Sequence, residues 1–148
     1  MQEYFGRYTN ILDAKGRINL PAHFRDLTSR DQNGDLVFIM THGSEENIAV
    51  FPISEWRRQI GEMEEKITDG KDWRIFIRDM NYNASRQKVD KQGRINIPAG
   101  LIEYAHLEKE VDVMGAGNNF EIWNPAKLNS FLNASRSRLD ELSDIRRY

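Results

Sequence analysis

The sequence predicts an α+β fold in which two β-rich repeats are fused within one chain of 148 residues. The first observation is a repeated stretch: residues 13–24 read DAKGRINLPAHF, and residues 90–101 read DKQGRINIPAGL. Seven of the first ten positions are identical between these copies. The second is that similar apolar runs follow each copy. The third is that two amphipathic segments separate the copies, so the repeats are expected to be joined by helices.

Short apolar runs and alternation predict the strands. Residues 18–20 and 95–97 alternate apolar, polar and apolar, which is the period of a half-buried strand. Pro21 and Pro98 end these strands and set the backbone for the first turn of a short helix. The remaining strands are predicted from apolar runs at residues 37–40, 48–51, 111–114 and 120–123.

Apolar spacing and capping signals predict the helices. Ser54 is the expected N-cap of a helix that carries the apolar stripe Trp56, Ile60, Met63 and Ile67. Residues 68–70 break this helix, and a second one carries Trp73, Phe76, Ile77 and Met80. Asn124 and Pro125 mark the start of a last helix, whose apolar period to residue 145 predicts one helix docked on the protein. The expected division is repeat 1 at 7–54, a helical connector at 55–82, repeat 2 at 83–126 and a C-terminal helix or tail at 127–148.

Charge is unevenly distributed along the chain, although the net charge is only −2. Residues 1–25 contain four basic and two acidic residues, and residues 71–100 contain seven basic and three acidic ones. This local excess suits a polyanionic partner. The chain has no cysteine, which excludes disulfides and thiolate chemistry. No apolar run approaches the roughly 20 residues of a membrane helix, and no secretory signal begins the chain, so a cytosolic protein is expected.

The repeated stretch is predicted to form a charged turn twice. Asp13 and Asp90 are expected to accept hydrogen bonds from backbone amides two and three residues later. Gly16 and Gly93 are expected in the left-handed conformation that closes a three-residue hairpin loop with a bulge. These four residues are therefore interpreted as the turn scaffold.

The cations of the two turns allow two interpretations. Arg17 and Arg94 either form an internal bidentate pair with the turn aspartate or point outward to phosphate oxygens and guanine edges. Lys15 and Lys91 lie near the tips of the turns, where no structural role requires a cation. Two basic turns of one geometry favour a binding role.

The paired D-x-x-G-R turns, each followed by I-N-[LI]-P-A, resemble the MraZ family of transcriptional regulators from the bacterial division and cell-wall gene cluster. That family belongs to the SpoVT/AbrB group of swapped-hairpin proteins. F-G-R-Y near the start and E-V-D-V-M-G-A-G-N-N-F-E-I-W agree as well, and the similarity covers about residues 4–128. The resemblance implies two AbrB-like swapped-hairpin repeats fused into one pseudo-symmetric barrel, with a connecting helical hairpin and a C-terminal helix.

The resemblance also implies a function: sequence-specific binding of double-stranded DNA at short direct repeats upstream of its own operon. It implies a homo-oligomer in the form of a closed ring, located in the cytoplasm on the nucleoid. Arginines of the D-x-x-x-R turns contribute to DNA contact, with the first repeat as the main site. The second copy lacks a counterpart of Phe5-Gly6-Arg7, which leaves its contact role open. The candidate DNA-binding residues are Arg7, Lys15, Arg17, Arg86, Lys91 and Arg94.

Two alternative functions are considered. An enzyme is not expected, because His23, His42 and His106 are far apart without metal-ligand spacing, and the polar loop 41–46 lacks a nucleophile elbow. No cofactor, metal or small-molecule substrate is expected. The other alternative is a protein-binding scaffold or an antitoxin-like module of the same fold, in which residues 133–148 hold a partner.

Overall fold

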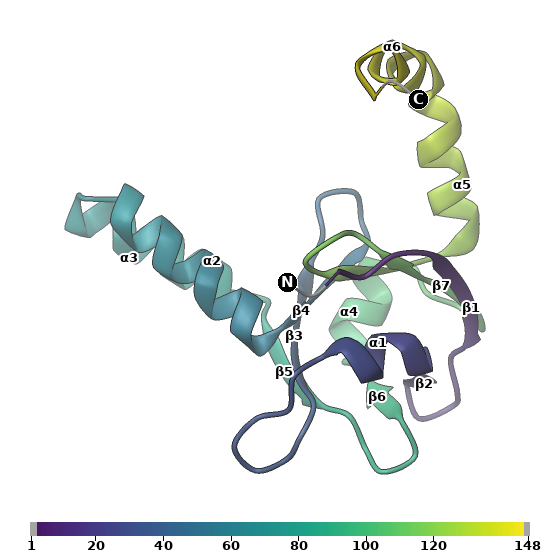
Figure 1. The fold of residues 1–148 in the computed structure, drawn as a ribbon, viewed down its shortest axis with the longest axis horizontal. Helices are drawn as coiled ribbons and strands as arrows, with labels where there is room; N and C mark the ends of the chain where they lie inside the picture. Colours follow the sequence, from purple (N-terminus) through teal and green to yellow (C-terminus); the bar gives the residue numbers. More distant parts are fainter. Residues whose placement is uncertain (1–2, 147–148) are drawn as a thin grey trace.

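The computed structural model describes residues 3–146. Six strands form one antiparallel sheet: β1 (Arg7–Ile11), β3 (Val37–His42), β4 (Ile48–Pro52), β5 (Ser85–Lys88), β7 (Glu110–Gly115) and β8 (Phe120–Trp123). Two further strands, β2 (Arg17–Asn19) and β6 (Arg94–Asn96), form a separate two-stranded ribbon. The helices are α1 (Ala22–Leu27), α2 (Ile53–Lys66), α3 (Gly70–Tyr82), α4 (Ala99–Tyr104), α5 (Pro125–Ala134) and α6 (Arg136–Arg146). The predicted α+β class is confirmed (Figure 1).

The two repeats exchange strands. The order of the sheet is β1-β7-β8-β4-β3-β5, so β8 and β4 pair at its centre and each repeat lends its first strand to the other. β2 of repeat 1 likewise pairs with β6 of repeat 2. Within residues 3–146 the strands form no closed barrel, because β1 and β5 are the unpaired edges of the sheet. The barrel in the prediction is therefore not confirmed.

The hydrophobic core lies between the sheet, the ribbon and the short helices. Phe24 of α1 packs against the rings of Tyr4, Tyr8 and Phe120, with ring centroids 5.0–5.4 Å apart. The ribbon adds Ile18, Ile95 and other apolar residues to the same cluster. Burying these side chains from both repeats makes the core a shared one, which ties the two halves together.

The helical connector consists of α2 and α3. α2 begins at Ile53, directly after Pro52, and no side chain caps it. The predicted cap at Ser54 is wrong because Pro52, whose backbone is extended, is the N-cap, so the helix starts two residues earlier than expected. The predicted break is confirmed: Asp69 caps α3 by accepting hydrogen bonds from the amides of Lys71 at 2.8 Å and Asp72 at 3.1 Å.

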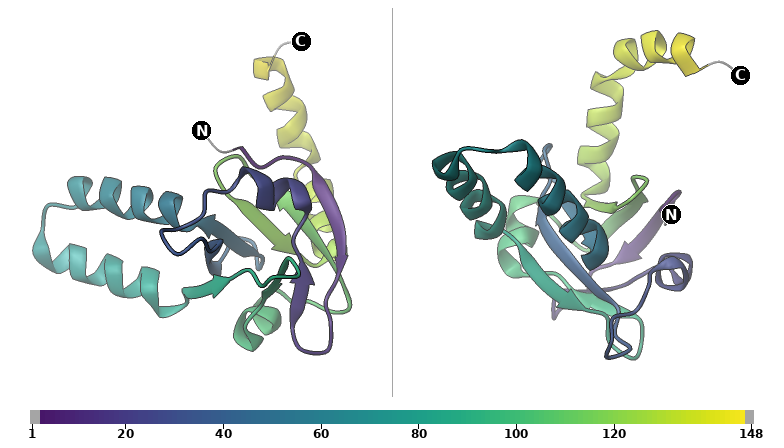
Figure 2. Two further views of the ribbon diagram at one scale, coloured as in Figure 1. Left: turned by 60° about the horizontal axis from the view of Figure 1, so that its bottom comes forward. Right: turned by 60° about the vertical axis from the view of Figure 1, so that its left-hand side comes forward.

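α2 and α3 form an arm that extends from the sheet. Figure 2 shows the two helices running antiparallel beside each other, away from the body of the protein. Neither helix contains a buried residue, although both are amphipathic. Ile75 is 58% exposed and Tyr82 is 86% exposed. Much apolar surface of the arm therefore has no partner among residues 3–146.

The C-terminal segment differs from the prediction. It forms two helices, α5 and α6, because the chain leaves helical geometry at Ser135, whose hydroxyl donates to the carbonyl of Phe131 at 2.8 Å. Leu128 is the buried residue of α5, whereas Leu142 and Ile145 of α6 are 40% and 75% exposed. The two helices extend from the sheet (Figure 1), so the prediction of a single docked helix is wrong.

Candidate nucleic-acid interface

Two turns with the same backbone geometry connect the sheet to the ribbon: turn 1 (residues 13–17) and turn 2 (residues 90–94). Oδ1 of Asp13 accepts hydrogen bonds from the backbone amides of Lys15 and Arg17, both at 2.9 Å. Oδ1 of Asp90 accepts the amides of Gln92 and Arg94 at the same distance. The donors are thus two and four residues after the aspartate, whereas two and three were predicted.

The turns are not the β-hairpin loops that the sequence predicted. β1 pairs with β7, and β2 pairs with β6, so the strands on either side of turn 1 belong to different ladders. The two turns do contain left-handed glycines as predicted, with φ of +79° at Gly16 and +81° at Gly93. The local turn was therefore predicted correctly, but the partners of its flanking strands were not.

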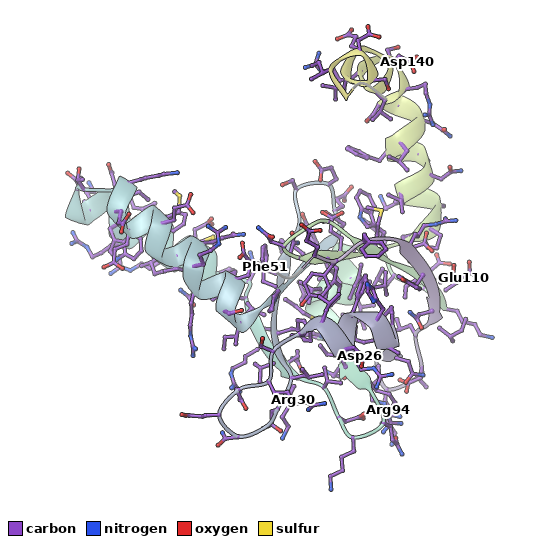
Figure 3. The ribbon with its side chains drawn as sticks, viewed as in Figure 1. Asp26, Arg30, Phe51, Arg94, Glu110 and Asp140 are labelled. Carbon is purple, nitrogen blue, oxygen red and sulfur yellow. The ribbon has the colours of Figure 1, made fainter. Side chains whose placement is uncertain are left out.

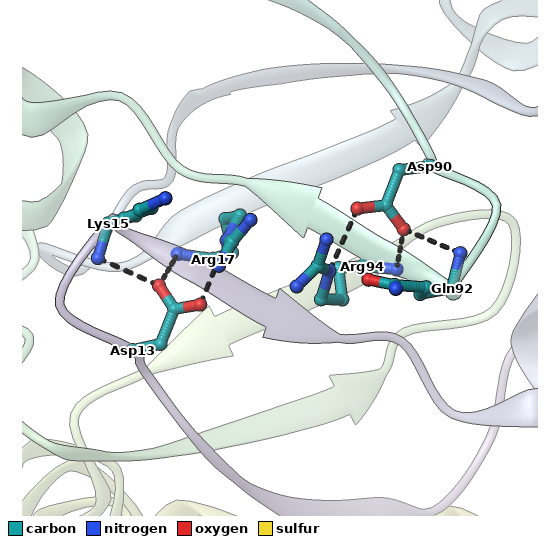
Figure 4. Close-up of polar contacts among 6 residues, drawn as sticks. All are labelled: Asp13, Lys15, Arg17, Asp90, Gln92 and Arg94. Atoms are coloured by element: carbon teal, nitrogen blue, oxygen red, sulfur yellow. Dashed lines mark hydrogen bonds and ion pairs between the residues drawn. The ribbon is translucent and has the colours of Figure 1, made fainter.

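Each turn aspartate also holds the arginine that follows it. Nε of Arg17 lies 2.9 Å from Oδ2 of Asp13, and Nε of Arg94 lies 2.8 Å from Oδ2 of Asp90 (Figure 4). The guanidinium uses one nitrogen for this contact, so the bidentate pair that one of the two interpretations described is not formed. Within residues 3–146 the terminal Nη atoms of both arginines make no hydrogen bond, and these side chains are 28% and 30% exposed. The aspartate orients the guanidinium and leaves two donor groups for a ligand.

The charges of the turns persist over a wide pH range. The backbone amide of Arg17 lowers the pKa of Asp13, and the guanidinium of Arg17 and the amide of Lys15 lower it further. The amide of Arg94 has the same leading effect on the pKa of Asp90. Hydrogen bonds to a carboxylate favour its charged form, so both ion pairs are intact at neutral pH.

The ribbon fixes the turns beside each other. Ile18 faces Ile95 in register and both are buried, so the ribbon is attached to the core through its inner face. The amide of Leu20 donates to the carbonyl of Gly93 at 2.9 Å, and that of Ile97 donates to the carbonyl of Gly16 at 2.7 Å. Each turn is thereby hydrogen-bonded to the strand of the other repeat. The outer face of the ribbon carries Arg17, Asn19, Arg94 and Asn96.

Sequence reasoning did not identify the two asparagines as site residues. Asn19 lies opposite Arg94, and Asn96 lies opposite Arg17. Both asparagines are exposed, and their side chains make no hydrogen bond within the part of the chain that the structure describes. The alternation R-I-N in both repeats was the available signal, because a buried isoleucine places both of its neighbours on the outer face.

The surroundings of the two turns differ. On turn 2, the guanidinium of Arg25 rests against Gly93, so that a Cβ at that glycine would lie 2.9 Å from Cζ of Arg25. Nε of Arg25 donates to the carbonyl of Leu20 at 3.3 Å. On turn 1, the corresponding neighbour is Ile102, whose Cδ1 would lie 3.5 Å from a Cβ at Gly16. Arg25, which the sequence analysis did not single out, therefore adds a cation to turn 2.

The remaining candidate cations lie in different places. Lys15 and Lys91 are exposed on the two turns, and neither ammonium has a partner within residues 3–146. Arg7 lies at the end of β1 remote from turn 1, where its Nη1 is 3.5 Å from Oδ2 of the buried Asp112. The structure therefore does not bring Arg7 together with the turns.

Arg86 lies on the exposed side of β5, at a hollow with three arginines. It lines this hollow together with Arg30 and Arg57. Figure 3 shows Arg30 and Arg94 along the same edge of the molecule, and the loop after β1 reaches that edge as well (Figure 1). α5 and α6 extend on the opposite side. Cations from several loops thus share one edge of the protein.

The histidines do not form a site together. His42 stacks on Tyr104 with ring centroids 3.7 Å apart, and Nε2 of His106 lies 3.1 Å from Glu46. Across residues 3–146, no three potential ligands among His, Asp and Glu come together to hold a metal ion.

None of the helices described is both long and apolar enough to cross a membrane.

Comparison with known proteins supports one family. A family model described as "MraZ protein, putative antitoxin-like" matches residues 4–79 and again residues 80–144. Curated proteins named Transcriptional regulator MraZ match from Halothermothrix orenii and Carboxydothermus hydrogenoformans, each 35% identical and covering 95% of this chain and 94% of the relative. One from Lactiplantibacillus plantarum is 33% identical, covering 95% of this chain and 96% of the relative. The duplicated turn and the matches over both repeats identify this chain as a member of the MraZ family.

Proposed function

We propose that this protein is a sequence-specific DNA-binding transcriptional regulator that acts in the cytoplasm, on the nucleoid. Its target is short direct repeats upstream of its own division and cell-wall operon. The curated relatives, all named transcriptional regulators, support a regulatory role. The proposal depends above all on one observation: two congruent turns each hold an arginine by Nε, and its terminal nitrogens have no partner among residues 3–146.

The chemistry of the turns suits the backbone of double-stranded DNA. The proposed contacts are Lys15 and Arg17 on turn 1, and Lys91 and Arg94 on turn 2. A guanidinium that is already held in place loses less conformational entropy on binding phosphate or guanine than a free one. Arg7 and Arg86, which lie away from the turns, would contact only DNA that bends around the protein or runs beyond the two turns.

A ring of subunits would make these contacts strong enough to be useful. Four cations per subunit neutralise few phosphates and release few counterions, so a single subunit would bind DNA weakly. Several identical subunits that each take one repeat would bind by avidity. The unpartnered apolar surface of α2 and α3 supports such assembly, and with the exposed Tyr82 and Ile75 it is the proposed contact between neighbours. The unit that assembles would be repeat 1 (7–54), connector (55–82), repeat 2 (83–126) and tail (127–148).

DNA binding is tested with the DNA immediately upstream of the gene and a scrambled duplex of equal length. Arg17→Ala and Arg94→Ala should each reduce affinity for the upstream DNA about 10-fold and lower the slope of log affinity against log salt by about 1. Arg138→Ala is the matched control, because Arg138 pairs with Glu141 on α6, on the far side of the molecule. Light scattering of each variant checks that assembly is retained. Unchanged affinity of both turn variants would refute the assignment.

A second candidate function is a protein-binding module. It is favoured by the exposed apolar residues of α6, of which Leu142 is 40% exposed and Ile145 is 75% exposed. The test is DNA binding by the chain truncated after residue 132, compared with the full chain. Repeat-specific binding that persists in the shortened protein supports the regulator. Loss of DNA binding together with capture of a protein partner by the tail supports the module.

A further inference from the structure

We propose that the outer face of the β2–β6 ribbon reads base edges in the major groove, and that Asn19 and Asn96 are the side chains that recognise adenine. This inference rests on the proposed function. It adds a chemical identity to the target, because it names which base each type of side chain recognises.

The two asparagines have a rigid support. Each follows a buried isoleucine of the ribbon, Ile18 or Ile95, whose side chain is 1% or 0% exposed. The ribbon is extended at both ends by the hydrogen bonds from the amides of Leu20 and Ile97 to the turn glycines. The packed core therefore fixes the position of these side chains, which do not depend on a flexible loop. Direct recognition of DNA bases requires such a rigid support.

The asparagines also have the right chemistry. A side-chain amide combines one acceptor and two donors, and it matches N6 and N7 of adenine in the major groove. The free terminal nitrogens of Arg17 and Arg94 match O6 and N7 of guanine in the same way. Neither asparagine amide has a hydrogen-bond partner within residues 3–146, so both are available to a ligand.

The spacing of the face agrees with DNA. Arg17 opposes Asn96, and Asn19 opposes Arg94, so the face contains two arginine–asparagine pairs of opposite orientation. Directly opposed residues lie about 5 Å apart. The pairs are separated by two residues along the strand, or about 6.6 Å, which is close to two base-pair steps of about 3.4 Å. We therefore expect each pair to read its own step of a short mixed adenine–guanine element.

The first experiment compares specific with non-specific binding. Asn19→Ala and Asn96→Ala should each lower affinity for the upstream DNA about 10-fold, since a bidentate base contact contributes about that much discrimination. Affinity for the scrambled duplex should not change. The control is Asn133→Ala, an exposed asparagine of α5 outside the ribbon. Equal losses on both duplexes, or no loss on either, would overturn the assignment of these residues as base readers.

A second experiment tests the base itself. Replacing adenine by 7-deazaadenine in the upstream DNA removes the N7 acceptor without changing base pairing. The parent protein should bind the substituted DNA about 10-fold more weakly, whereas the Asn19→Ala/Asn96→Ala protein should not distinguish the two. If the substitution of adenine lowers the affinity of the double variant as much as that of the parent, adenine recognition by these residues is refuted. If the parent protein binds upstream and scrambled DNA equally, the proposed function itself fails, independently of the asparagines.

Discussion

Turn 1 and turn 2 have nearly the same internal geometry but different neighbours. The ion pairs from Nε to the aspartate measure 2.9 and 2.8 Å, and the glycine φ angles are +79° and +81°. The turns differ in the side chain that lies against each glycine. Ile102 of α4 lies against turn 1, and the guanidinium of Arg25 of α1 lies against turn 2. The lysine also moves from the third position of turn 1, Lys15, to the second position of turn 2, Lys91.

This comparison shows that the internal hydrogen bonds of a turn and its surface chemistry are separable. The aspartate, glycine and arginine shape both turns alike, because the hydrogen bonds of the aspartate side chain lie within five residues. The charge that a DNA strand would meet depends on residues from the other repeat. Turn 2, which the sequence made the weaker candidate, has one more cation beside it than turn 1.

The largest effect is expected from the residues that hold the two turns together. Ile18→Ala and Ile95→Ala each remove a buried side chain where the two strands face each other. Each should lower the free energy of unfolding by about 2–5 kcal/mol, through lost burial and a cavity in the core. Urea denaturation measures this. If one variant were much less destabilising than the other, the ribbon would not join the two turns equally.

A smaller effect on stability is expected from replacing the turn glycines, and it should differ between Gly16 and Gly93. Ala at either position adopts a left-handed conformation that costs about 1–2 kcal/mol. At Gly16 the new Cβ would also lie 3.1 Å from the carbonyl oxygen of Ile97, which is held by the ribbon. At Gly93 it would meet the guanidinium of Arg25, which can move aside. Gly16→Ala should therefore destabilise the protein more than Gly93→Ala does, as measured by urea denaturation. The reverse order would contradict the roles assigned to Ile97 and Arg25.

The third test replaces the residues that lie against the turns, Arg25 and Ile102, and measures DNA-binding affinity. Arg25→Ala should weaken binding to the upstream DNA about 3- to 10-fold and lower the salt slope by about 1, because it removes a cation beside turn 2. Ile102→Ala, at the corresponding place beside turn 1, should leave the salt slope unchanged. Fluorescence anisotropy over a range of salt concentrations distinguishes them. Equal slopes for Arg25→Ala and the parent would exclude a phosphate contact at this arginine.

The smallest difference is expected in the titration of the aspartates. The pKa of both Asp13 and Asp90 is lowered, mainly by the amide of the arginine four residues later. A lowered pKa stabilises the folded protein at pH values above the unfolded pKa of about 3.9, and this contribution is lost as the pH falls through the folded value. The turns should therefore be insensitive to pH between 5 and 8. Carboxyl NMR titration should show both midpoints below 3.8, and a midpoint at or above 3.8 in either would contradict the turn geometry.

Much of the fold could be predicted from short-range signals. Asn124 begins a helix as expected, since its side chain accepts hydrogen bonds from the amides of Ala126 and Lys127. Errors arose where a neighbouring residue changed the outcome: Pro52 moved the start of α2, and the break at Ser135 divided the tail. The docking of the tail was not predictable, because a helical period in the sequence does not say which surface, if any, will cover it.

The sequence by itself determined that the chain consists of two repeats, and that each contains an aspartate-held, glycine-dependent, basic turn. Those features depend on hydrogen bonds between residues at most four apart. Only the tertiary structure decided that the first strand of each repeat pairs with the other repeat, that Arg25 lies on turn 2, and that Asn19 and Asn96 share one face. Such contacts join residues that are more than 40 positions apart, and burial of a common core selects them, which no local pattern encodes.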